Sequence, residues 1–144
     1  MDILSIAIIL FIILETSNIM ILYFKPDSKL GNGVAVFDGW EESKKDKELH
    51  EFVKYLVYWV AGTKLIFIVL LVVILLIGNE TTKLLSVVAL ILSIASYYWK
   101  LSPIIRYLDS KNKITPKGYS KTLDRMILGF ILVFASSLVF YFIF

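Results

Sequence analysis

Four long apolar runs constrain this chain more than any other feature. They cover residues 3–24, 55–77, 84–106 and 125–144. Each approaches the ~20 apolar residues that an α-helix needs to cross a hydrocarbon core ~30 Å thick. Because lipid offers the backbone no hydrogen bonds, runs of this kind span the membrane as helices. The mean hydropathy of +0.80 agrees with a membrane protein.

Beside these runs only short connections and one longer segment, residues 25–54, remain, so no separate soluble domain fits. The sequence therefore predicts a single transmembrane domain, residues 1–144. Its fold class is an all-α integral membrane protein whose four transmembrane helices form an antiparallel up-down bundle. We expect the first run to be a retained helix rather than a signal peptide, because no basic region precedes it and Lys25-Pro26-Asp27 follows it.

Basic residues are distributed unevenly between the two sides of the predicted bundle. Six lie in the connection 25–54, six more lie in or beside the connection 107–124, and the opposite side carries only Lys83. By the positive-inside rule, both connections face the cytoplasm. We therefore expect a multi-pass protein of the cell (cytoplasmic) membrane with both termini outside.

The connection 25–54 carries the signals of a short helix. Asp38 followed by Glu41 matches a capping box, with Trp40 in the first turn of the predicted helix. We expect an interfacial cytoplasmic helix at the headgroup level, with Trp40 and Phe52 as a docking surface on its apolar side. A solvated linker with a frayed helix is the alternative.

Other local signals predict where helices begin and end. From Asp46 the apolar spacing is helical again and can run straight into the second span. Pro103 predicts a kink or the end of the third span. Ser120 or Thr122 can cap the fourth. The basic connection 107–124 is interpreted as a topology signal, with binding of anionic headgroups as the alternative, and its composition does not indicate nucleic-acid binding.

The composition gives no reason to expect a cofactor or a metal. The chain has no cysteine, which excludes disulfides and thiolate metal sites. His50 is its only histidine, so no second histidine can complete a metal site. We interpret His50 as a surface or interfacial residue.

Two charged residues stand deep inside the predicted spans. Glu15 lies nine residues before the end of the first run, and Lys64 lies nine residues after the start of the second. If these runs are antiparallel helices, a rise of ~1.5 Å per residue puts both ~13 Å from the same membrane face. A lone charge at that depth costs at least ~2.5 kcal/mol, and such groups usually pair or line a water-filled path. The sequence therefore favours a Glu15–Lys64 pair, either as a structural clamp or as a functional site.

Further polar residues extend this candidate site. Asn18 shares a helix face with Glu15, and Thr63 precedes Lys64. The third span carries a polar stripe that ends at Lys100, which could instead snorkel to the interface. The candidate intramembrane polar site comprises Glu15, Asn18, Thr63, Lys64, Ser93, Ser96, Tyr97 and Lys100.

Three function classes remain open. The first is a small transporter or channel whose charged site serves a proton, an anion or a small anionic solute. Since four helices rarely enclose a wide aqueous path, this class implies a homo-oligomer in the lipid bilayer. The second is a noncatalytic accessory or assembly subunit that docks on a membrane protein partner through its cytoplasmic loop. The third is a lipid-acting membrane enzyme, which is disfavoured because the sequence presents no nucleophile–base constellation.

Overall fold

The computed structural model describes residues 2–143, and within them the fold is all-helical. Four helical segments of the described chain are long and apolar enough to cross a membrane. They are α1 (Ile3–Phe24), α3 (Lys47–Ile77), α4 (Glu80–Ala95) continued by α5 (Tyr97–Ser110), and α6 (Tyr119–Ile143). The 3-10 turn η1 (Val34–Val36) and the short helix α2 (Asp38–Ser43) lie between α1 and α3. The predicted four-helix membrane bundle is confirmed.

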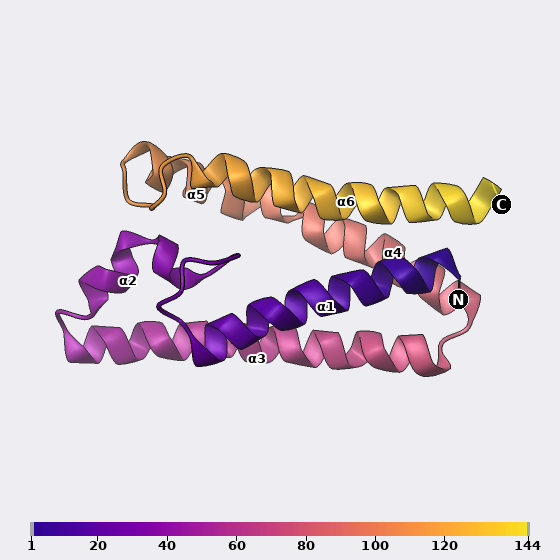
Figure 1. Ribbon diagram of the computed structural model, residues 1–144, viewed down its shortest axis with the longest axis horizontal. Helices are drawn as coiled ribbons and strands as arrows, with labels where there is room; N and C mark the ends of the chain where they lie inside the picture. Colours follow the sequence, from indigo (N-terminus) through magenta and orange to yellow (C-terminus); the bar gives the residue numbers. More distant parts are fainter. Residues whose placement is uncertain (1, 144) are drawn as a thin grey trace.

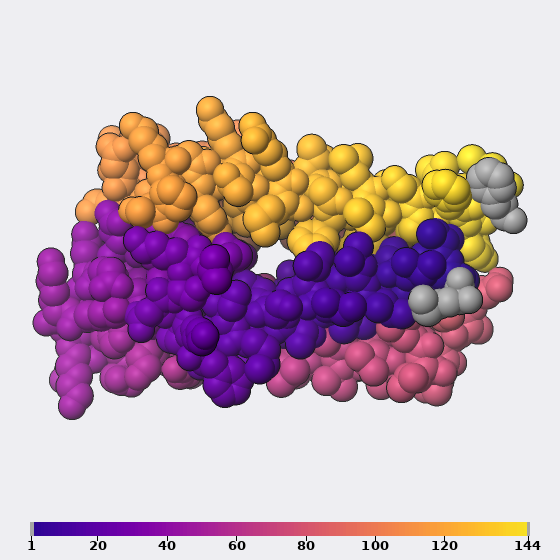
Figure 2. Space-filling view, viewed as in Figure 1, coloured from indigo at the N-terminus to yellow at the C-terminus, as the bar shows by residue number. Residues whose placement is uncertain are grey.

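The helices run up and down, so the two ends of the bundle differ in character (Figure 1). One end, called here the loop end, holds η1, α2 and the connection between α5 and α6. The opposite end holds both ends of the chain and the short turn between α3 and α4. α1 is the central helix, because it packs against α3, α4 and α6. Toward the loop end the α1–α3 pair and the α5–α6 pair diverge, and Figure 2 shows an opening between α1, α6 and the segment that follows α1.

Polar caps fix the helices at the end that carries the termini. Asp2 accepts hydrogen bonds from the backbone N–H of Ser5 and from Lys83 Nζ at 2.9 Å, which ties the start of α1 to α4. Burial raises the pKa of Asp2, but the hydrogen bonds from Lys83 and Ser5 outweigh it and hold that pKa well below its usual range. Asn79 caps α4 by accepting from the N–H of Thr82.

Three helix boundaries differ from the apolar runs. α3 begins at Lys47, with Asp46 as its cap, so the predicted continuation from Asp46 into the second span is present. The third span is interrupted at Ser96, and the helix then continues through Pro103 to Ser110. Proline within a helix removes one backbone hydrogen bond, and here the surrounding turns keep the helix intact. α6 begins at Tyr119, six residues before the apolar run.

The two long connections pair with each other at the loop end. Phe37 and Ile114 form an isolated antiparallel β-bridge. The Asp38 N–H donates to the Lys113 carbonyl at 3.0 Å, and the Thr115 N–H donates to the Val36 carbonyl at 2.8 Å. α2 begins at Asp38 as expected, but Phe37 and not Asp38 occupies the N-cap position, and no side chain there makes a capping hydrogen bond. The first backbone N–H of the helix, that of Asp38, donates instead to the Lys113 carbonyl.

Trp40 is an internal anchor and not the exposed docking residue that the sequence predicts. Its side chain is only 2% exposed, its Nε1–H donates to Asp27 Oδ1 at 2.7 Å, and its ring lies 4.9 Å from that of His50. Burying the large indole against α3 is favourable because its N–H finds an acceptor. His50 is half-buried and exchanges a hydrogen bond with Ser43 Oγ. Phe52 remains exposed.

We predict that Asp27→Ala lowers the free energy of unfolding by ~1–3 kcal/mol, because it leaves the buried Trp40 N–H without its acceptor. Asp27→Asn keeps an oxygen at this position and should cost less. Thermal unfolding of purified protein in a neutral detergent measures both changes. An Asp27→Ala variant that unfolds at the same temperature as the parent would contradict the assignment of Trp40 as an anchor.

The same contact predicts a pH dependence. Hydrogen bonds from Lys44 and then from Trp40 lower the pKa of Asp27. The ionised carboxylate therefore stabilises the fold above its unfolded pKa of ~3.9, and this contribution disappears as the pH falls through the folded pKa. The effect should be small because Asp27 is largely exposed. The loss of stability that Asp27 causes between pH 5 and ~2 should therefore be absent when the unfolding of Asp27→Ala is measured over the same range.

Candidate functional site

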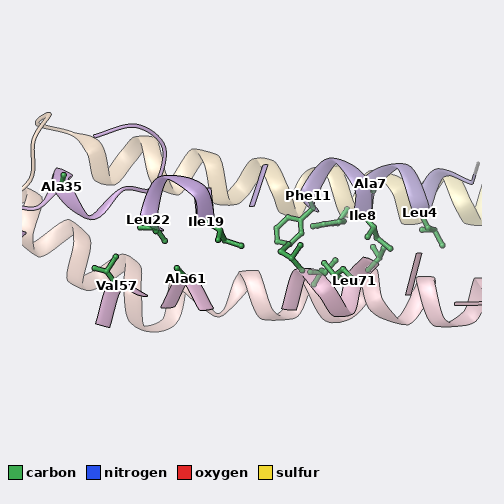
Figure 3. Close-up of a cluster of buried hydrophobic side chains, with 14 of the residues drawn as sticks. Leu4, Ala7, Ile8, Phe11, Ile19, Leu22, Ala35, Val57, Ala61 and Leu71 are labelled. Carbon is green, nitrogen blue, oxygen red and sulfur yellow. The ribbon is translucent and has the colours of Figure 1, made fainter. Parts of the chain in front are cut away.

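A polar layer interrupts the apolar core between α1 and α3. Figure 3 shows two groups of buried apolar side chains along α1, one ending at Phe11 and the other starting at Ile19. On α3 the buried apolar positions are likewise interrupted between Ala61 and Ile68. Glu15 and Asn18 on α1, and Lys64 on α3, occupy these interruptions.

Lys64 is the centre of this layer. Its Nζ donates to Glu15 Oε2 at 2.8 Å and to Asn18 Oδ1 at 2.7 Å. The side chains of Lys64 and Glu15 are 27% and 20% exposed, so the pair is largely withdrawn from the surface. The antiparallel arrangement brings the two charges to one level, as their equal distances from the ends of the apolar runs predict. Charge-assisted hydrogen bonds of this kind are about twice as strong as neutral ones.

Asn18 has a donor group that nothing in the described chain satisfies. The residue is 9% exposed, and its buried Nδ2 has no hydrogen-bond partner among residues 2–143. An unsatisfied buried donor costs ~1–3 kcal/mol, so Nδ2 is suited to a ligand or a bound water. Lys64 uses two of its three N–H groups, so it also retains one donor. The layer therefore offers unused donors beside an ion pair.

The segment after α1 lies against this layer on the side of the loop end. Gly31 has a φ of +59°, a left-handed conformation that glycine adopts at no steric cost, and a Cβ there would lie 3.8 Å from Asn18 Nδ2. The Gly31 carbonyl accepts a hydrogen bond from the Tyr119 hydroxyl at 2.9 Å. This bond joins the segment over Asn18 to the start of α6.

Several residues of the predicted site do not join the layer. Thr63 is exposed, and its hydroxyl donates to the Trp59 carbonyl of its own helix. Ser93 and Ser96 are also exposed, and Ser96 Oγ donates to the Ser93 carbonyl. In membrane helices such hydroxyls commonly bond the preceding turn, as those of Thr63 and Ser96 do here.

Lys100 and Tyr97 separate from the layer in different ways. Lys100 is exposed, with Nζ 5.2 Å from the centroid of the Trp99 ring, which fits the interfacial alternative. Tyr97 is buried, but its hydroxyl donates to Asp124 Oδ1 at 2.9 Å, in a second polar cluster. The predicted stripe on the third span is thus divided between the surface and this cluster.

Asp124 is the centre of the second cluster, between α5 and α6. Its Oδ1 accepts from Tyr97 and from Ser102 Oγ at 3.0 Å. Its Oδ2 accepts from Arg106 Nε at 3.0 Å and Nη2 at 2.6 Å, and its backbone carbonyl accepts from the Tyr98 hydroxyl. The carboxylate thus has four donors, and they fasten α5 to α6 at positions from Tyr97 to Arg106.

The sequence analysis did not identify Asp124. The apolar run begins at Arg125, so Asp124 was assigned to the connection, whereas α6 extends back to Tyr119. One available signal is that Asp124 is the only acidic residue of α6. Another is that Ser102 and Arg106, four residues apart, share one face of α5.

The long apolar helices make this a multi-pass membrane protein. No protein-family model matches the chain, and comparisons with curated proteins and with solved structures also find no match. Within residues 2–143, no group of three or more His, Cys, Asp or Glu side chains is placed to hold a metal ion. The two polar clusters are therefore the candidate functional features of the described chain.

We predict that Asp124→Ala destabilises the protein more than Arg106→Ala does. Removing the carboxylate leaves the Tyr97 and Ser102 hydroxyls without their acceptor, at a cost of ~1–3 kcal/mol. Arg106 is 64% exposed, so its loss leaves a carboxylate that keeps two donors and gains water. Unfolding in detergent tests the order, and an equal or reversed effect would contradict the assigned role of Asp124.

Proposed function

We propose that this protein is a small oligomeric transporter or channel for a small anion, with Glu15, Asn18 and Lys64 as its intramembrane site. The observation that carries the proposal is the buried Nδ2 of Asn18, which lies beside Lys64 and has no hydrogen-bond partner among residues 2–143. Ionisable residues within membrane spans are costly, and they commonly mark substrate or ion pathways. An anion at this layer would accept hydrogen bonds from Asn18 Nδ2 and from the remaining N–H of Lys64.

The ion pair is better suited to the passage of an anion than to its tight binding. Glu15 and Lys64 carry −1 and +1, so the pair is neutral overall, and an arriving anion must share Lys64 with a carboxylate. Glu15 thus competes with the anion for the Lys64 ammonium, which weakens the hold of the site on the anion. Conduction requires a site that is favourable enough to enter and weak enough to leave.

The route to the site has different surroundings at the two ends. Toward the loop end, an opening separates α1 from α6 beside the segment after α1 (Figure 2). Toward the termini, α1 and α6 border an apolar groove of about 340 Å³, which offers an anion few partners. A second subunit is therefore needed to complete the path. From the positive-inside rule we expect the loop end to face the cytoplasm.

A second candidate is the accessory-subunit function, and a specific surface favours it. On α3, Phe52, Tyr55 and Trp59 are exposed and stack in a row, with ring centroids 6.5 Å and 6.1 Å apart. Exposed aromatic side chains are enriched in binding interfaces. If the protein is an accessory subunit, this row, and not the buried Trp40, is the face for a membrane partner.

Flux measurements in liposomes test the transport proposal. We expect the parent to carry chloride or acetate, and Lys64→Met and Asn18→Leu to slow this flux ~10-fold or more, because each loses a contact worth ~1.5–3 kcal/mol. Lys100→Met is the matched control, since it removes a lysine outside the layer, and its flux should equal that of the parent.

Two results would reject this function. One is a folded parent that does not carry the anion. The other is a Lys100→Met variant that loses as much flux as Lys64→Met. In either case the accessory-subunit function becomes the favoured proposal. Trp59→Ala should then weaken association with a membrane partner, whereas Glu15→Gln should leave that association unchanged.

A further inference from the structure

A cavity lined by polar residues lies at the loop end, between the end of α5 and the start of α6. Its volume is about 570 Å³, and it is separate from the layer around Lys64. Three basic side chains and two carboxylates line it, together with small polar residues. The lining residues are Arg106, Asp109, Ser110, Lys117, Gly118, Ser120, Lys121 and Asp124.

Both carboxylates of this cavity are already satisfied. Asp109 is buried and accepts from the N–H of Gly118 at 2.9 Å, and from the N–H and hydroxyl of Ser120 at 3.1 Å and 2.5 Å. It therefore caps the start of α6, the role that the sequence assigns to Ser120 or Thr122. Asp124 is held by Arg106, Tyr97 and Ser102. Neither carboxylate needs a cation from solution.

The basic side chains of the cavity, in contrast, retain free hydrogen-bond donors. Arg106 bonds Asp124 through Nε and Nη2, which leaves Nη1 available. Lys117 and Lys121 are exposed, and within the described residues neither forms an ion pair. Three positive charges against two negative ones give the lining a net charge of +1. The free cationic groups of the cavity are all hydrogen-bond donors.

From this arrangement we propose that the cavity binds a phosphate group, carried by an anionic phospholipid headgroup or by a soluble phosphate. Arginine and lysine are the side chains that recognise phosphate oxygens most strongly, arginine through its planar fork and lysine as a point charge. The cavity lies where the α5 and α6 spans end, so a lipid phosphate can reach it from the bilayer. Basic residues near a membrane surface attract anionic lipid at ~1 kcal/mol each.

Thermal unfolding of the purified full chain in a neutral detergent tests this site. The probes are phosphatidylglycerol, phosphatidylcholine with the same acyl chains, and inorganic phosphate against chloride at equal ionic strength. The test variant is Lys117→Gln/Lys121→Gln. The matched control is Lys45→Gln/Lys47→Gln, which removes the same charge from exposed positions at the same end but outside the cavity.

We expect phosphatidylglycerol, but not phosphatidylcholine, to raise the unfolding temperature of the parent and the control saturably. The concentration for half of the effect should rise ~10-fold in the test variant, which corresponds to ~1.4 kcal/mol. Stabilisation by phosphatidylglycerol alone would identify a lipid headgroup as the source, and stabilisation by inorganic phosphate as well would show that the phosphate group suffices.

The proposal is overturned if neither phosphatidylglycerol nor inorganic phosphate stabilises the parent. It is also overturned if the test variant responds like the parent, or if the control variant loses the response as much as the test variant does. Both test side chains are exposed, so we expect the variant to fold. The single variants Lys117→Gln and Lys121→Gln give the same test should the double variant fail. Because the readout is binding and not flux, it does not depend on the proposed transport function.

Discussion

The ion pair between Glu15 and Lys64 is the interaction on which the arrangement of this protein depends most. In water an exposed pair contributes little, but in a membrane an unpaired charge costs at least ~2.5 kcal/mol. A slide or rotation of α1 against α3 would break the contacts of Lys64 with both Glu15 and Asn18. Apolar packing against lipid specifies register poorly, because lipid tails are as apolar as the side chains. The polar layer therefore supplies the register that the apolar faces cannot.

The remaining polar contacts connect this fixed pair of helices to the rest of the fold. The segment after α1 lies against Asn18 and is bonded to Tyr119 at the start of α6. α6 is in turn bonded to α5 through Asp124 and through Asp109. Most of the surface of the four long helices remains apolar and exposed, available to lipid or to further subunits. Specific polar bonds thus position helices whose outer faces are nearly uniform.

Parts of this description follow from the sequence, for clear physical reasons. Length and hydropathy predict the four spans, because the bilayer sets the length of a spanning helix. The encounter of Glu15 with Lys64 follows from a constant rise per residue in consecutive antiparallel helices. The bridge between Phe37 and Ile114 could not be predicted, since it joins residues far apart in the chain. Trp40 was misjudged because helical periodicity does not reveal whether a neighbouring segment covers a face. Asp124 was missed because hydropathy marks the apolar core of a span and not the polar turns at its ends.

A double-mutant cycle on the stability of the purified protein shows whether Glu15 and Lys64 meet within the membrane. Glu15→Gln, Lys64→Met and the double variant would each be unfolded in the same detergent. We predict that each single change destabilises the protein, and that the double variant is more stable than the sum of the two effects requires, by ~1–3 kcal/mol. Additive effects would contradict the account, because they would mean that the two charges do not meet within the membrane.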